Sequence, residues 1–518
     1  MPIVGAMHRS RWPAVLAALT LALADGGCSY PPQIKRTLVP PDQPGTLDRK
    51  APYLKAHLRD GGVYLLARWT VDEAGGTVAG EGELMGPDRQ VREKGPFTVP
   101  LTSVVLFETN VVPPSPSLAD RTVMTGISLA VTAACLTWPK ACFGSCPTFY
   151  VGEGAEARLM AEGFSTSIAP SLEATDVDAL PGARPRGRRF EVHMTNEALE
   201  THVVRQVHLL AARRPPGGRV VADRTGALFA VTGLRAPASC AAEEGDCRQA
   251  LAAQDGRERT SASDGRDLAA RELLDLTFDG PGDGPLGLVV GARQTLLTTF
   301  LLYQTLAYMG PAAGDWLALL ERQGPASPVV ERVHALRDVL GGIEVLVPDG
   351  DGGWTRVGEV YETGPLASDV KVLPLPAMEG PPRVRLRVAR GHFRVDSVAL
   401  ARLGAAVTPQ RLAPVEVRRE DGPRVDAFAR GPLVTFPGDR YRFVYQLPPE
   451  PDSLELFLES RGYYLEWMRQ EWLAEADPAA VMRVFGDPRR TLVDLAPEYH
   501  RQEAEMEKAF WSSRYAAR

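Results

Sequence analysis

Short runs of alternating apolar and polar residues, bounded by glycine or proline, recur along most of this chain. They have the two-residue period of a strand that buries one face, as in 343–347, 354–360, 383–388 and 393–400. The 518 residues include 49 glycines and 44 prolines, which favour turns and short strands over long helices. The sequence therefore predicts a β-rich α+β protein with antiparallel, β-sandwich-like units, a helical insert and a helical C-terminus.

Helical patterns are confined to a few segments. Residues 292–309 are apolar on most faces and are followed by Gly310-Pro311, which ends a helix. Further helices are predicted over 116–138, 316–322, 329–340 and 496–515, the last beginning at Asp494 or Pro497. The apolar runs 116–138 and 295–309 fall short of a good membrane span, because about 20 apolar residues are needed to cross a bilayer. Core helices are the favoured interpretation.

Changes in composition divide the chain into successive segments. The predicted organisation is a signal peptide (1–27), a proline-rich tether (28–49), a small antiparallel β unit (50–112), a helix plus β-rich unit (113–235), a polar loop excursion (236–270), a helical insert (271–340), a β-sandwich-like unit (341–460) and a helical C-terminal segment (461–518).

The N-terminus has the pattern of an export signal. A basic flank with Arg9 and Arg11 precedes an uncharged apolar stretch over 13–24, and small residues follow. Cys28 comes directly after them, an arrangement that resembles the cleavage and lipidation site of bacterial lipoproteins. The resemblance implies that Cys28 carries a diacylglyceryl thioether and an N-terminal acyl chain such as palmitate.

One residue departs from the lipoprotein pattern. Asp25 stands three residues before Cys28, where an aliphatic residue is usual. The alternative is an ordinary secretory signal cut near Ala22 or Ala24, which leaves Cys28 as a plain thiol. With lipidation, the chain is expected to be anchored to the cell envelope, and Ser29 permits sorting to the outer membrane.

The remaining cysteines suggest disulfides, since an exported chain meets oxidising conditions. Cys142 with Cys146, and Cys240 with Cys247, are local pairs, which makes two short disulfides the simplest proposal. Cys135 is then left over as a buried thiol, although spacing alone does not fix connectivity.

A group of histidines and glutamates is the best candidate for metal or acid–base chemistry. His193, Glu200 and His202 meet if 190–194 and 201–210 form a hairpin, and such side chains suit zinc. A purely structural hairpin is the favoured interpretation. The chain has no His-Glu-x-x-His pair, and no metal or cofactor is predicted.

A second candidate site lies in 341–402. Trp354, His392, Phe393 and Asp396 belong to a strand-rich region that could offer aromatic platforms to a sugar, although single aromatics on strands are more often core. The sequence has no Gly-x-Ser-x-Gly nucleophile motif and no phosphate-binding loop. Its formal net charge of −6 does not suggest binding to nucleic acid.

Three segments resemble a loosely defined group of uncharacterised exported bacterial lipoproteins. They are Cys-Pro-Thr-Phe-Tyr at 146–150, a stretch at 161–170, and Thr-Asn-Glu-Ala-Leu-Glu-Thr-His at 195–202. The resemblance implies an exported, β-rich protein of several parts and supplies no catalytic residues.

The expected function is non-enzymatic. A membrane-anchored lipoprotein with a binding or envelope-structural role leads, with an envelope protein or a glycan as the possible partner. The alternatives are a metal-dependent hydrolase that uses His193, Glu200 and His202, and a glycan-binding module in 341–402.

Overall fold

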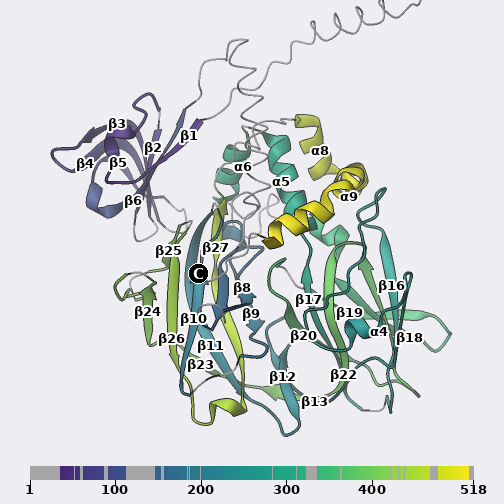
Figure 1. Ribbon diagram of the computed structural model, residues 1–518. Coiled ribbons are helices and arrows are strands. Elements are labelled where there is room, and N and C mark those ends of the chain that lie inside the picture. Colours follow the sequence, from purple (N-terminus) through teal and green to yellow (C-terminus); the bar gives the residue numbers. More distant parts are fainter. Residues whose placement is uncertain are drawn as a thin grey trace, which may run out of the picture.

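A computed structural model describes residues 35–512. It leaves out 112–145, 322–334 and 467–476, together with short gaps at 52, 59–61, 87–90, 153–156, 184, 186, 199, 283, 311, 362–363, 421, 430 and 437. Antiparallel sheets make up most of the described chain, and helices gather at one end of them (Figure 1). The predicted β-rich fold with few helices is therefore confirmed, whereas the sandwich-like arrangement stays a prediction.

The first six strands form a sheet of their own, in the order β1-β6-β2-β3-β4-β5. The strands are β1 (Lys35–Val39), β2 (Tyr53–Leu58), β3 (Val63–Asp72), β4 (Thr77–Met85), β5 (Val91–Pro100) and β6 (Val104–Val111). Their buried side chains, including Leu54, Leu66 and Phe107, form a separate core.

Two five-stranded sheets follow and share one core. One has the order β24-β26-β10-β7-β8, and the other β23-β11-β27-β9 with β25 beside β11. The strands are β7 (Thr148–Val151), β8 (Arg158–Glu162), β9 (Ala174–Ala179), β10 (Arg189–Thr195), β11 (Glu200–Arg213), β23 (Gln410–Leu412), β24 (Glu416–Arg419), β25 (Leu433–Thr435), β26 (Arg440–Gln446) and β27 (Leu454–Glu466). Val192 and Phe443 of the first sheet and Val207 and Leu458 of the second lie in the same hydrophobic cluster.

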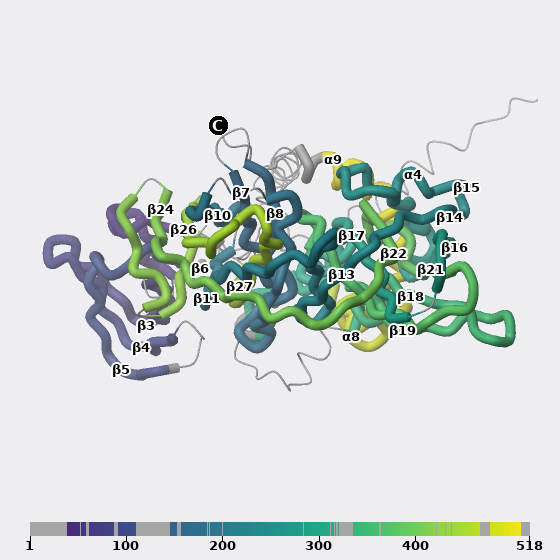
Figure 2. The backbone as a smooth tube through the Cα atoms, turned by 90° about the horizontal axis from the view of Figure 1, so that it is seen from below, coloured from purple at the N-terminus to yellow at the C-terminus, as the bar shows by residue number. Residues whose placement is uncertain are grey.

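The other half of the β structure is a closed barrel, β12-β13-β22-β17-β20, beside a six-stranded sheet, β15-β14-β16-β21-β18-β19. The strands are β12 (Gly218–Ala222), β13 (Leu228–Arg235), β14 (Ser239–Ala242), β15 (Gly245–Asp246), β16 (Arg271–Thr277), β17 (Leu286–Gln294), β18 (Ile343–Pro348), β19 (Trp354–Val360), β20 (Asp369–Leu375), β21 (Arg383–Ala389) and β22 (Phe393–Val407). Seen from below, this half and β1–β6 lie on opposite sides of β10, β11 and β27 (Figure 2).

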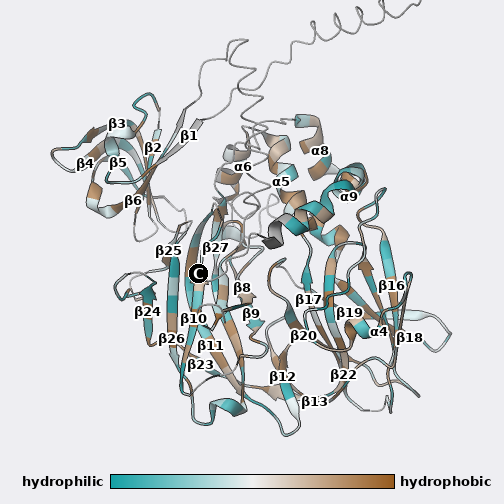
Figure 3. Cartoon of the chain, in the orientation of Figure 1, coloured by the Kyte–Doolittle hydropathy of each residue, from teal (hydrophilic) through white to brown (hydrophobic). Residues whose placement is uncertain are grey.

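The helices cover one end of the two β halves. They are α5 (Leu297–Met309), α6 (Ala312–Glu321), α8 (Pro478–Gly486) and α9 (Pro488–Ser512), with a helical segment at 335–340 and the short α4 (Arg248–Leu251) elsewhere. The hydropathy colouring marks α5 as largely apolar (Figure 3), and its Phe300 ring packs 5.1 Å from that of Tyr499 in α9. No helix among the described residues is long and apolar enough to cross a membrane.

Several predicted boundaries are wrong. Lys35–Val39, expected in the tether, pairs with β6 along its length. Residues 271–294, expected within a helical insert, form β16 and β17, so the helix begins at Leu297.

The C-terminal half also departs from expectation. The strands of 341–460 are divided among four sheets rather than forming one unit, because their partners lie far away in the sequence. The last helix begins at Pro488, where proline suits the first turn, and Pro497 lies inside it.

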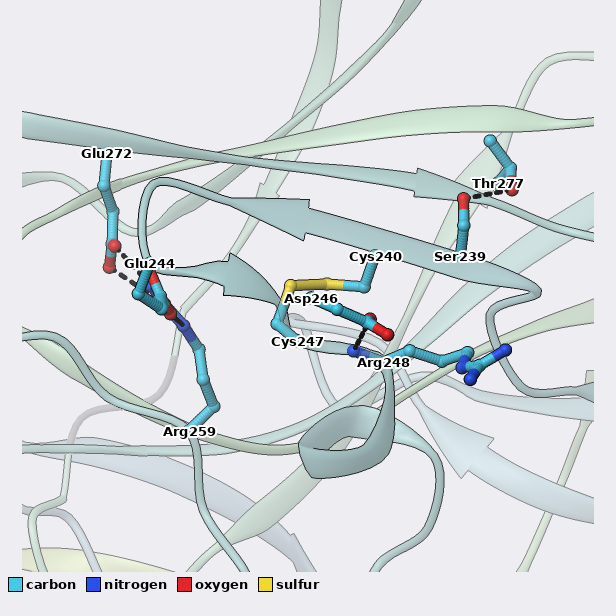
Figure 4. Close-up of a disulfide and its surroundings, with 9 residues drawn as sticks. All are labelled: Ser239, Cys240, Glu244, Asp246, Cys247, Arg248, Arg259, Glu272 and Thr277. Carbon is cyan, nitrogen blue, oxygen red and sulfur yellow. Dashed lines mark hydrogen bonds and ion pairs between the residues drawn. A yellow bond between two sulfur atoms is a disulfide. The ribbon is translucent and has the colours of Figure 1, made fainter.

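One predicted disulfide is present. Cys240 and Cys247 are bonded and close the hairpin formed by β14 and β15 (Figure 4). Beside it, Arg259 donates to Glu272 at 2.7 and 2.5 Å and also bonds Glu244, which ties the following loop to β16. The excursion at 236–270 is thus attached to the sheet by covalent and ionic links.

Candidate functional site

A cavity of about 160 Å³ lies where the ends of β11 and β27 meet the helices. Its apolar wall comes mainly from the helical end of the molecule and includes Leu301, Leu302, Trp316, Leu336, Leu340, Val484 and Phe485. An engineered apolar cavity of about 150 Å³ accommodates benzene, so this space suits a small organic molecule. An apolar pocket with a few convergent polar groups is the usual form of a ligand site.

Three glutamates supply the acidic side of the cavity. Glu200 begins β11 and Glu466 ends β27, and the two are direct cross-strand partners, 2% and 8% exposed. Glu162, at the end of β8, is 3% exposed. Like charges directly opposite each other on adjacent strands destabilise a sheet. Two glutamates at facing positions are therefore an unusual feature of this sheet.

Hydrogen bonds hold the three carboxylates in place. His202 Nε2 lies 3.2 Å from Glu200 Oε2, and the Tyr303 hydroxyl donates to Glu466 Oε1 at 3.1 Å. The Leu366 backbone N–H donates to Glu162 Oε2 at 2.8 Å. The three partners belong to a strand (His202), a helix (Tyr303) and a loop (Leu366). Three different elements therefore fix the positions of the carboxylates.

Two further polar groups at the cavity stay uncharged. Burial raises the pKa of the Cys146 thiol well above its ordinary value, and the carboxylates of Glu162 and Glu200 raise it further. Burial likewise raises the pKa of Tyr464, whose hydroxyl donates to the Ser165 carbonyl at 3.1 Å. A neutral thiol is a poor nucleophile and a poor metal ligand, so Cys146 is not suited to either role.

The predicted disulfide between Cys142 and Cys146 is wrong at Cys146. That residue is a free, buried thiol that lines the cavity, shortly before β7 begins at Thr148. Cys142, Cys135 and Cys28 lie outside the described residues, so lipidation of Cys28 stays a prediction.

The predicted histidine cluster is only partly assembled. Glu200 and His202 are in contact, but His193 lies on β10, which pairs with β26 and β7 rather than with β11. The expected hairpin between 190–194 and 201–210 is therefore wrong, and His193 instead lies 3.8 Å from Glu420. Within the described parts of the chain, no three His, Cys, Asp or Glu side chains are placed to share a metal ion.

The predicted sugar-binding residues of 341–402 do not share a surface. His392, Phe393 and Asp396 are each at most 4% exposed. Trp354 is more accessible, but the guanidinium groups of Arg383 and Arg385 lie 5.5 and 4.2 Å from its ring centroid. The two arginine side chains thus lie over the aromatic ring on which a sugar would have to stack.

Sequence reasoning missed Glu162 and Glu466. The last β-rich unit was expected to end at residue 460, whereas β27 continues to Glu466. Alternation over 458–466 places Tyr464 and Glu466 on one face, and a glutamate ending an otherwise apolar face is the signal that could have indicated the pair.

Comparison with known proteins supplies no family. No protein-family model matches the chain, and no curated protein matches it. Among solved structures, BpGH86A, a β-porphyranase of glycoside hydrolase family 86 from the human gut bacterium Bacteroides plebeius, is similar with a TM-score of 0.16 and 8% identity. The match covers 49% of this chain and 39% of that one, and a similarity this low carries no argument.

Proposed function

We propose that this is an exported, lipid-anchored binding protein whose cavity takes a small organic cation with an apolar body. The observation that carries the proposal is the buried pair Glu200 and Glu466 on one wall of a cavity with apolar walls. A bound ammonium group donates charge-assisted hydrogen bonds to both carboxylates, and its positive charge relieves the repulsion between them. The role is non-enzymatic.

Charge and size define the ligand class. The cavity is lined by three buried carboxylates, so the attraction between opposite charges favours a ligand with one positive group. Its volume leaves room for an apolar part of about four to six heavy atoms, judged against the benzene-sized reference cavity. Primary alkylamines with a branched tail, such as 3-methylbutylamine, meet both requirements.

The test is calorimetric titration of the purified chain with 3-methylbutylamine and with 3-methylbutan-1-ol, which has the same shape and no charge at neutral pH. We expect the amine to bind at least ten-fold more tightly, because a hydrogen bond to a charged group contributes about 1.5–3 kcal/mol. Glu200→Gln and Glu466→Gln should each weaken amine binding about ten-fold and leave the alcohol unaffected.

Glu459→Gln is the matched control, since Glu459 lies on the same strand and does not line the cavity. The free energy of unfolding, measured in urea, should not fall in Glu466→Gln, because glutamine keeps an acceptor for Tyr303 and removes one of two opposed charges. Equal affinity for the amine and the alcohol, or amine binding unchanged in both cavity variants, would contradict the proposal.

The alternative function, a metal-dependent hydrolase, can be distinguished from a binding protein by its metal content. It needs His193, Glu200 and His202 at one ion, whereas contacts link only the last two. Elemental analysis of the purified chain that finds one zinc per molecule, lost in His202→Ala, would favour the hydrolase over a binding protein.

A further inference from the structure

Arg337 lines two cavities at once. It belongs to the helical segment 335–340 and contributes to the wall of the acidic cavity described above. It also lines a second, larger cleft of about 730 Å³, which is bordered by β9, the β12–β13 turn and the strands β18 and β19. Of the described residues around the acidic cavity, Arg337 alone carries a positive charge.

The contacts of Arg337 place its guanidinium between the two spaces. The group lies 5.8 Å from the centroid of the Tyr361 ring, and Tyr361 lines the second cleft. Its ion pair with Asp338 is loose, at 3.6 Å, and its side chain is one-third exposed. A planar guanidinium with spare donors recognises a carboxylate through two parallel hydrogen bonds.

The second cleft is polar, and its charged side chains largely pair with one another. Arg356 lies 3.2 Å from Glu344 and 3.0 Å from Glu359, and Arg224 lies 3.5 Å from Glu359. An anionic group held by Arg337 at this boundary keeps access to water, so its desolvation costs less than in the apolar cavity. Arg337 and the three glutamates all line the acidic cavity, so one ligand that carries both charges can contact them there.

We propose that the ligand is a zwitterion of the α-amino-acid type, with its ammonium group towards Glu200 and Glu466, a branched apolar side chain in the cavity and its carboxylate on Arg337. This inference rests on the proposed function and names its ligand class. Arg337 then determines specificity, because it binds the carboxylate that distinguishes an amino acid from the amine with the same carbon skeleton.

Three probes of one carbon skeleton test the inference. L-leucine carries both charges, 3-methylbutylamine lacks the carboxylate, and 4-methylpentanoate lacks the ammonium group. Titrated into the full chain, leucine should bind at least ten-fold more tightly than the amine, since one charge-assisted pair is worth about that factor. The pentanoate should bind most weakly, because its only charge matches that of the carboxylates.

Arg337→Gln should abolish the advantage of leucine over the amine, and the amine should bind no more weakly than to the wild type, because the variant removes a positive charge from the cavity wall. Arg356→Gln is the matched control, since Arg356 lines the second cleft and not the acidic cavity. Arg337→Lys should restore part of the advantage, which excludes loss of folding as the cause.

The results separate this inference from the function on which it rests. Tight amine binding with no preference for leucine, or an equal loss for both ligands in Arg337→Gln, would overturn the role of Arg337 and leave the cation site intact. Binding of 4-methylpentanoate as tight as that of leucine would overturn the orientation. Failure of both leucine and the amine to bind the wild-type chain would overturn the proposed function and this inference together.

Discussion

Glu200 and Glu466 occupy a position that a packed sheet would normally give to apolar or oppositely charged residues. Cross-strand pairing brings the two carboxylates together, and the helices then cover them. A local arrangement that folding disfavours is a common mark of a functional site. The same reasoning does not extend to Cys146, because its raised pKa keeps it a neutral thiol.

His392 is the residue whose titration has the clearest effect on stability. It is fully buried, its ring lies 4.4 Å from that of Phe393, and its Nε2 lies 3.3 Å from Thr298 Oγ1. Burial lowers its pKa to about 3, and the charge of Arg271 acts in the same direction. The folded state therefore holds His392 neutral, whereas the unfolded chain binds a proton below about pH 6.5.

The contribution of His392 to stability is complete above pH 6.5 and is lost as the pH falls from there towards 3. For this group alone the loss is about 3 kcal/mol between pH 7 and pH 4. Urea unfolding at both pH values should show a smaller decrease for His392→Gln than for the wild type. His500→Gln, which alters a half-exposed histidine, is the control and should match the wild type. An equal decrease in all three proteins would refute the assignment to His392.

At the scale of elements, strand periodicity predicted well where one face is buried. Segments 383–388 and 393–400 lie within β21 and β22, where buried and partly exposed residues largely alternate. Helix α5 was also predicted, because its apolar run ends at Gly310, which adopts a positive φ. The predicted helix was begun too early, because residues 292–294 instead end the buried strand β17.

Pairing partners could not be predicted from the same signals. Glu200 faces Glu466 only because β11 and β27 pair in a particular register, and neither strand carries a local turn that would fix it. A hairpin between neighbouring segments was the simplest expectation for His193 and His202, but long-range pairing overrode it. Of the three glutamates at the cavity, only Glu200 was therefore identified from the sequence, and their arrangement in space was not predicted.

The β14–β15 hairpin gives a prediction that belongs to one element. Cys240 and Cys247 are both buried and close a loop with a sequence separation of 7. Limiting the unfolded chain by such a loop stabilises the fold by about 2–3 kcal/mol. The double variant Cys240→Ala/Cys247→Ala should unfold at correspondingly lower urea concentration. The wild type unfolded in a reducing agent should behave as the variant does, and no difference between oxidised wild type and variant would contradict a stabilising role.

At the scale of the whole molecule, the first sheet reaches closer to the predicted anchor than composition suggested. The segment 28–49 was expected to be a tether, but β1 begins at Lys35 and is paired throughout. Six residues, 29–34, then separate Cys28 from the sheet, and they span at most about 20 Å. If Cys28 is lipidated, the sheet of β1–β6 lies next to the membrane, with the binding cavity on the part of the chain that follows.

This arrangement depends on lipidation of Cys28, which Asp25 puts in question. Two acyl chains anchor a protein stably, whereas one chain gives only marginal binding. We therefore expect cells fed radiolabelled palmitate to label the wild type and not Cys28→Ala, and the variant to move from the membrane fraction to the soluble exported fraction. Asp25→Leu, which restores the usual aliphatic residue, should label at least as strongly as the wild type. Equal label in wild type and Cys28→Ala, or none in either, would remove the anchor and with it the placement of the sheet beside the bilayer.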